Sequence, residues 1–270
     1  MNAGQGPDLL GVCEVENRFV VDGLLDAVSN HLGGRAYEVV HADTDDARGI
    51  DVACIYDPDR FEVPDDATFF NVVMRRNATR EIVQVNFRTT TGLTWAVFGN
   101  HWPSRSGGQH ESAGYRHIAG ETLAYFHQRV LEVHGPDTPA LAMGDFNDEP
   151  FDTSLVTHAL STRQRQKVIS AREVPRFWNL MWPAMGGPDG TFYFDNQPNL
   201  LDQFLANKNM AIQNSPLRVL ADTVEILRFA DMTNTGTYPK PNPFGGMGDP
   251  VDEDGFSDHF PIGVHITEAD

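Results

Sequence analysis

Short apolar runs of β-strand length, each bounded by turn residues, recur along the whole 270-residue chain. They are rich in Val, Ile, Leu and Phe, which favours strands buried in a sheet. Helical spacing of apolar residues occurs at 22–32 and at 112–134, where Ser112 is the expected N-cap, and 152–160 favours a shorter helix. Many strands with few helices predict two packed sheets with helices outside. The nine runs span residues 8–13, 50–56, 68–74, 81–88, 93–100, 139–144, 200–207, 224–229 and 260–266.

The length and composition of the chain suit one globular domain over residues 1–270, with 40% hydrophobic and 21% charged residues. No apolar run approaches the ~20 residues that span a bilayer, so we expect no stable membrane insertion. Residues 1–8 lack the features of a signal peptide, which fits a cytoplasmic protein or one secreted after signal removal. The sequence leaves the oligomeric state open.

The net charge of −18 repels nucleic acid and anionic membranes at long range. This argues against tight, nonspecific DNA binding. It leaves a phosphate substrate open, because bound divalent cations invert the local field. Cys13 and Cys54 lie in strand-like segments, where buried free thiols are favoured over a disulfide, and the second option stays open.

Several apolar runs lead directly into, or out of, a polar residue that can bind a metal or transfer a proton. If these strand ends share one edge of a sandwich, Glu14, Asp145 and Asp258 form the oxygen-rich site that Mg²⁺ prefers. Two histidines then supply an acid and a base at neutral pH. Each residue alone also fits an ordinary turn or an exposed position, so the order and the set carry the prediction. The residues are Glu14, Asn100, His101, Asp145, Asn147, Asp202, Asp258 and His259.

Five motifs follow one another in a recognisable order: CEVEN at 13–17, NHWPSR at 100–105, GDFNDEP at 144–150, GTFYF with LLDQFL at 190–205, and GFSDHFPI at 255–262. The set resembles the endonuclease/exonuclease/phosphatase superfamily of DNase I-like metal-dependent hydrolases, and in detail its poorly characterised bacterial branch. The resemblance implies a four-layered α/β sandwich, with two mixed β-sheets face to face and helices outside. Family members usually begin with an Asn-bearing strand before the glutamate motif. Only MNAGQGP precedes the first run here, so this fold is expected to lack that strand.

The resemblance also implies roles for the acidic residues and for one histidine. Glu14 and Asp258 would bind Mg²⁺ or Mn²⁺, and Asp145 would bind the metal or activate the attacking water. His259 would act as general base or as a ligand of the scissile phosphate. Asp202 would accept a hydrogen bond from His259, which fixes the imidazole tautomer and raises its basicity.

The remaining site residues are expected to bind phosphate or to protonate the leaving group. Asn147 would donate to a phosphate oxygen without adding negative charge, and His101 would protonate the leaving oxygen or bind phosphate. The guanidinium of Arg105 suits phosphate oxygens. Asn100 and Tyr193 are lesser candidates for binding the substrate phosphate.

Together these features predict a divalent-metal-dependent phosphoester hydrolase that acts by in-line attack of water. A phosphodiesterase or nuclease, with DNA and RNA among the candidate partners, is the leading interpretation. The alternatives are a phosphomonoesterase for small phosphorylated or lipid substrates, and a non-catalytic binding module. The cluster RRNATR at 75–80 fits either a phosphate-strand contact or a solvated turn. The aromatic segment 177–182 fits base stacking, lipid contact or packing on the sheet.

Overall fold

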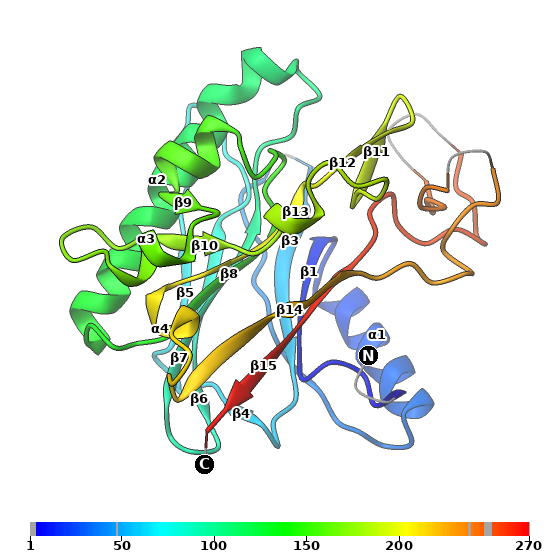
Figure 1. Ribbon diagram of the computed structural model, residues 1–270. Coiled ribbons are helices and arrows are strands. Elements are labelled where there is room, and N and C mark those ends of the chain that lie inside the picture. The colour runs from blue at the N-terminus through cyan, green and yellow to red at the C-terminus, as the bar shows by residue number, and fades with distance from the viewer. Residues whose placement is uncertain (1–3, 47, 237–238, 246–249, 270) are drawn as a thin grey trace.

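An eight-stranded mixed sheet runs through the middle of the molecule in the order β4-β6-β7-β8-β13-β10-β9, with β5 also paired to β6 (Figure 1). The computed structural model describes residues 4–46, 48–236, 239–245 and 250–269. In this sheet β7 and β8 are parallel, as are β9 and β10, and the other pairs are antiparallel. The strands are β4 Phe61–Glu62, β5 Thr68–Asn71, β6 Ile82–Thr89, β7 Thr94–His101, β8 Ala140–Asp145, β9 Ser161–Thr162, β10 Phe177–Asn179 and β13 Asp202–Ala206.

Two smaller sheets pack on one face of the large sheet, and residues of all three form one hydrophobic core. Among the described residues no strand pairing joins β1 to β15, so this layer consists of two pieces. The strand that carries Glu14, β1, is the first strand among the described residues. The three-stranded sheet has the order β1-β3-β2, with β1 Leu9–Val15, β2 Glu38–Val40 and β3 Asp51–Tyr56. The other sheet pairs β14 Leu217–Ile226 with β15 Ile262–Glu268, and β11 Phe192–Phe194 forms a separate hairpin with β12 Gln197–Asn199.

Helices cover the outer faces of both sheet layers (Figure 1). The long helix α2 packs on the far face of the large sheet through Ala119, Leu123 and Val130. On the other side, α1 packs on the three-stranded sheet through Val21 and Leu25. This is the predicted four-layered sandwich. The helices are α1 Arg18–His31, α2 Gln109–His134, the π-helix η2 Ser154–His158, α3 Arg165–Ile169, the 3-10 helix η3 Trp182–Ala184 and α4 Lys208–Ala211.

The predicted helix starts were too late along the chain. Asn17 accepts a hydrogen bond from Val20 N at 3.1 Å and caps α1, which begins at Arg18. Helix α2 begins at Gln109, so Ser112 lies inside its first turn and donates its hydroxyl to Gly108 O, which corrects its assignment as the cap. Both cysteines are free thiols. No described helix has the length and apolar character needed to cross a bilayer.

Candidate active site

Three neighbouring strands of the large sheet bring their functional residues to the same edge. Parallel β7 and β8 both end there, and their register pairs His101 with Asp145. Antiparallel β13 begins at this edge, and its register pairs Asp202 with Asp145. Because paired residues on adjacent strands are neighbours, three residues that are far apart in sequence are fixed next to one another. His259, just before β15, completes the group.

The pair of His259 and Asp202 forms as predicted. His259 Nδ1 lies 2.6 Å from Asp202 Oδ2, and about a fifth of each side chain is exposed. Burial by itself lowers the pKa of His259. The charge and hydrogen bond of Asp202, followed by the charges of Asp145 and Asp258, outweigh burial and raise it to about 10. In the metal-free site His259 is therefore an imidazolium at neutral pH.

Asp145 and His101 have their charged forms disfavoured by burial. Burial raises the pKa of Asp145 to about 7, with His259 opposing this change and Asp202 adding to it. Burial lowers the pKa of His101 well below its usual value, and the cations Arg80, Arg48 and His259 lower it further. His101 Nε2 lies 3.7 Å from Asp145 Oδ2. The site therefore combines a neutral imidazole, a protonated imidazole and a carboxyl group that titrates near neutrality.

Hydrogen bonds from the turn after β8 orient the Asp145 carboxylate. Asn147 has a positive φ of 51°, which brings its backbone N–H to Asp145 Oδ1 at 2.8 Å. Its amide Nδ2 donates to Asp145 Oδ2 at 2.8 Å and to Trp102 O at 3.0 Å. Both amide hydrogens are therefore used within the protein. Asn147 positions Asp145, which corrects the prediction that it presents a free donor to phosphate.

Arg105 also holds the turn after β8 in place through its guanidinium group. Its Nε donates to Asn147 O at 2.7 Å, and Nη2 contacts Asp148 at 3.1 Å and Asp152 at 2.9 Å. Arg116, which is fully buried, also pairs with Asp148, at 2.8 Å. With two carboxylates and a carbonyl as partners, Arg105 holds the turn together. This geometry argues against the predicted role of Arg105 as a free phosphate ligand.

The burial of Asn100 contradicts its expected role, whereas the role of Tyr193 stays a prediction. The Asn100 side chain is completely buried, donates to Phe98 O and Met143 O, and accepts from Trp102 Nε1 at 2.9 Å. It cannot reach a substrate, so its assignment to phosphate binding is wrong. The Tyr193 hydroxyl accepts from Gly190 N at 3.3 Å. Its strand neighbour Phe192 contacts His259 instead, with ring centroids 4.9 Å apart.

Glu14 and Asp258 are the two predicted metal ligands outside the large sheet, and they differ in how close they lie to the other site residues. Glu14, at the end of β1, has a side chain that is 55% exposed, and its Oε1 lies 4.0 Å from His101 Nε2. Asp145, Asp202 and His259 each have a potential ligand atom within 4.8 Å of the others. Asp258 is exposed and does not belong to that group. Glu14 and Asp145 therefore flank the same imidazole nitrogen, whereas Asp258 acts on His259 through its charge.

Sequence reasoning did not identify Arg48 at the site, and it named Arg80 only as part of the 75–80 cluster. Arg48, 41% exposed, has Nη1 3.8 Å from Glu14 Oε1 and Nε 3.7 Å from Asp46. Arg80, the last residue of the 75–80 cluster, is buried, where it binds Asp46 at 3.2 Å and Trp102 O at 2.7 Å. The acidic run DTDD lies at 43–46, two positions before Arg48. An arginine two positions after such a run is the signal that could have identified Arg48.

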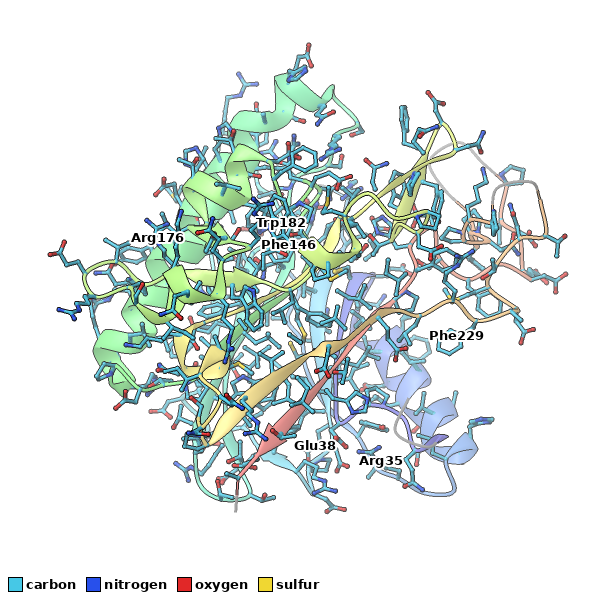
Figure 2. All side chains as sticks on the ribbon, in the orientation of Figure 1. Arg35, Glu38, Phe146, Arg176, Trp182 and Phe229 are labelled. Atoms are coloured by element: carbon cyan, nitrogen blue, oxygen red, sulfur yellow. The ribbon has the colours of Figure 1, made fainter. Side chains whose placement is uncertain are left out.

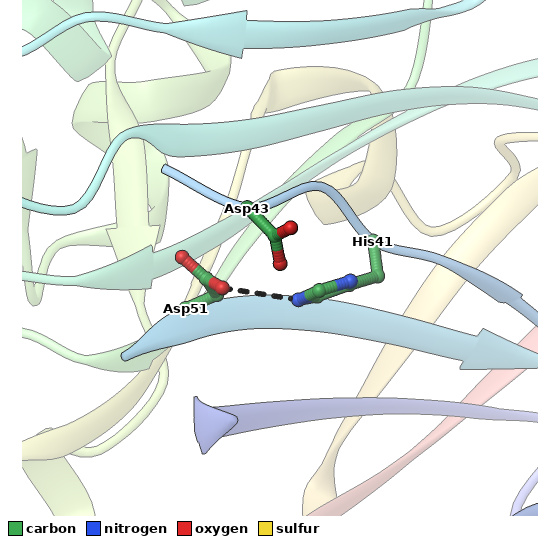
Figure 3. A group of neighbouring side chains, drawn as sticks. All are labelled: His41, Asp43 and Asp51. Atoms are coloured by element: carbon green, nitrogen blue, oxygen red, sulfur yellow. Dashed lines mark hydrogen bonds and ion pairs between the residues drawn. The ribbon is translucent and has the colours of Figure 1, made fainter. Parts of the chain in front are cut away.

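A second group of ionisable residues anchors the loop that carries Asp46 and Arg48. Figure 3 shows His41 hydrogen-bonded to Asp51, with Asp43 beside them. His41 Nε2 lies 3.1 Å from Asp51 Oδ2, and Asp51 Oδ1 accepts from the backbone and hydroxyl of Thr44. Both carboxylate oxygens of the buried Asp51 are thus used within the protein. This arrangement ties the start of the loop to β3.

Comparisons with known proteins agree with the fold. The profile of a family described as "Endonuclease/Exonuclease/phosphatase family" matches residues 1–268. No match was found among curated proteins. The structure of an endonuclease/exonuclease/phosphatase from Bacteroides vulgatus is similar, with 17% identity, a TM-score of 0.58, and coverage of 97% of this chain and 85% of the other.

Two further structures have the same fold at similarly low identity. A mannosyl-6-phosphatase from Bacteroides thetaiotaomicron shares 17% identity, with a TM-score of 0.58 and coverage of 96% and 85% of the two chains. The human Nocturnin catalytic domain with bound sulfate shares 15% identity, with a TM-score of 0.58 and coverage of 97% and 82%. At this identity the likeness concerns the fold.

Proposed function

Because the chain belongs to the endonuclease/exonuclease/phosphatase family, we propose that it hydrolyses phosphoesters with the help of Mg²⁺ or Mn²⁺. The observation that carries the proposal is the convergence of Asp145, Asp202, His101 and His259 at one edge of the large sheet. Their clustering is typical of a catalytic site.

The donor atoms fit a hard divalent cation. Glu14 and Asp145 offer carboxylate oxygens on either side of His101 Nε2, within 4.0 Å of it, and the Glu14 side chain is open to solvent. Mg²⁺ is commonly held by one or two carboxylates, with water and substrate phosphate as the other ligands. A cation held by Glu14 and Asp145 would polarise the phosphoryl group and stabilise the charge that develops on the leaving oxygen.

The shifted pKa values divide the proton-transfer roles. In the metal-free protein the pKa of Asp145 is raised to about 7, so Asp145 suits the base that accepts a proton from the attacking water when it does not itself bind the cation. His259, with a pKa of about 10, suits an imidazolium that binds the non-bridging oxygens and balances their charge. Asp202 orients His259, and neutral His101 hydrogen-bonds the phosphoryl group or the leaving oxygen. Such a separation of pKa values between neighbouring groups is how acid and base roles are assigned in active sites.

Phosphodiester hydrolysis, including nuclease activity, is the first candidate reaction. A phosphomonoesterase is the second, and the half-exposed Arg48 at the edge of the site favours it, because a terminal phosphate dianion carries one more charge to neutralise. A chain of net charge −18 has little long-range attraction for a long polyanion, which favours short substrates in both cases.

Hydrolysis of bis-p-nitrophenyl phosphate and p-nitrophenyl phosphate, with Mg²⁺, with Mn²⁺ and with EDTA, tests the proposal and separates the two reactions. We expect turnover that requires the cation and that falls by about 100-fold or more in His259→Ala. His31→Ala, at an exposed position in α1, is the matched control. A folded protein that hydrolyses neither compound, nor DNA, abasic DNA, RNA, inositol phosphates or sphingomyelin, would exclude the enzymatic function.

A further inference from the structure

A cavity of about 310 Å³ lies at the end of the large sheet that is opposite the catalytic edge. Asn207, which lines it, directly follows β13 and donates its N–H to the carbonyl of Ala140, the first residue of β8, at 2.9 Å. Both strands have their other ends at the catalytic edge, at Asp202 and Asp145. The six residues of β8 span about 17 Å, so the cavity is separate from the proposed active site. Its volume is within the range of about 300–1,000 Å³ that small-molecule sites occupy.

Three cationic side chains line this cavity without a partner for their charge. Arg172 and Lys208 are exposed, and Arg176, which is labelled in Figure 2, is the partly buried residue before β10. Within the described chain none of the three side chains makes a hydrogen bond or an ion pair. The chain has 38 acidic residues against 20 lysines and arginines, so partners for these cations are not scarce. Their donors are therefore free to bind a ligand.

Two glutamates also line the cavity, and they do not cancel its positive charge. Glu132 accepts a hydrogen bond from Gln128 Nε2 at 2.8 Å and forms an ion pair with Arg129, both in α2. Glu173 is the lining carboxylate that has no partner among the described residues. Three free cations thus face one free carboxylate, and the excess of positive charge favours a bound anion.

The lining also has an apolar part, which includes one unpaired buried nitrogen. Leu131, Val168 and Pro175 supply apolar surface. His127 is 1% exposed and stacks on Phe177, with ring centroids 4.1 Å apart, and its Nε2 has no hydrogen-bond partner among the described residues. Burial lowers the pKa of His127 to about 3, so this ring is neutral and adds no charge. Because buried polar atoms in proteins are normally paired, a ligand in the cavity is the candidate partner of this nitrogen.

We propose that this cavity binds a small organic anion, whose phosphate or carboxylate group pairs with Arg172, Arg176 and Lys208 while its apolar part packs against Leu131 and Val168. Arginine side chains suit both kinds of group, because their parallel N–H donors match two oxygens at once. The site lies away from the catalytic edge, so the proposal does not depend on the proposed hydrolytic function.

Calorimetric titration of the metal-free protein with phenylphosphonate, methylphosphonate and benzoate tests this site without requiring turnover. We expect phenylphosphonate to bind at least about tenfold more tightly than methylphosphonate, because its ring adds apolar area that is buried on binding. Arg176→Gln should weaken phenylphosphonate binding at least about tenfold through the loss of a charged hydrogen bond. Arg60→Gln, at an exposed position outside the cavity, should leave the binding unchanged. His259→Ala should also leave it unchanged, because the cavity is separate from the active site.

An undiminished affinity in Arg176→Gln would overturn the proposal, as would the failure of all three compounds to bind the wild-type protein. Loss of binding in His259→Ala would assign the anion to the catalytic edge and would also overturn it. If Arg176→Gln does not fold, as judged by circular dichroism, Lys208→Gln decides the question at an exposed position. Whichever of phenylphosphonate and benzoate binds more tightly identifies the ligand group as phosphate or carboxylate, and either result supports the site.

Discussion

Replacing Asp202 by Asn is the most direct test of how this site holds its imidazolium. The substitution keeps the shape of the side chain and removes its charge from a 2.6 Å contact with His259 Nδ1. A hydrogen bond between charged groups contributes about 1.5–3 kcal/mol. At 1.36 kcal/mol for each pKa unit, its loss should lower the pKa of His259, which is about 10, by about 1 to 2.

The same change should reduce catalysis more than it reduces folding. Removal of the carboxylate that orients an imidazole in a catalytic triad lowers kcat by about 10⁴, and we expect a decrease of about 10²–10⁴ here. The pKa of His259 is raised above its unfolded value of about 6.5. The wild-type pair therefore stabilises the metal-free protein fully below that pH, and this stability is lost as pH rises toward 10. In Asp202→Asn the stability of the metal-free protein should fall less steeply as the pH rises.

NMR titration of His259 in EDTA and kcat for bis-p-nitrophenyl phosphate with Mg²⁺ measure the two effects separately. Asp222→Asn, at an exposed position in β14, controls for the loss of one negative charge. If Asp202→Asn leaves both the His259 pKa and kcat at the values of the control, the pair is a surface contact, and the assignment of roles fails.

Three further substitutions probe the support of the site and the core. Arg105→Ala should cost about 2 kcal/mol in urea unfolding and lower kcat at least tenfold, because the turn at Asn147 loses its anchor; unchanged kcat would contradict this. Gly144→Ala should cost about 3 kcal/mol or more, since a Cβ would lie 2.1 Å from Asn100 O, at φ +126°. Burial lowers the pKa of His127 to about 3, so stability should fall by about 1.4 kcal/mol per pH unit below pH 6.5, and His127→Leu should reduce this slope in acid unfolding.

The pattern of apolar runs was sufficient to predict the layers, and the family resemblance predicted the contact between Asp202 and His259. Strand-length apolar runs determined which segments enter the sheets, and their ends determined which polar residues meet. Asp202 and His259 are 57 positions apart, yet they are in contact as predicted. Strand register explains one half of this contact, because it places Asp202 beside Asp145 on adjacent strands. His259 reaches the same edge from the segment just before β15, which belongs to another sheet.

The direction of side chains, and the hydrogen bonds that they make within the protein, could not be predicted in the same way. Asn100 and His101 are consecutive in β7, so they point to opposite faces, and only one of them can reach the site. The turn at Asn147 depends on a positive φ that no pattern of apolar residues reveals. Arg105 was expected to be free because its partners, Asp148 and Asp152, are recognisable as partners only in the folded turn.

The balance of charge at the site implies that the cation and the phosphate strengthen each other's binding. Glu14, Asp145 and Asp202 place carboxylates around the proposed position of the phosphate, and His259 and Arg48 are the cations that face them. Without a metal ion these groups nearly neutralise one another, and the remaining field is that of a protein with net charge −18. A bound divalent cation reverses the local sign. Inorganic phosphate should therefore bind by calorimetry at least about tenfold more tightly with Mg²⁺ than with EDTA, and equal binding in both conditions would show that His259 and Arg48 suffice.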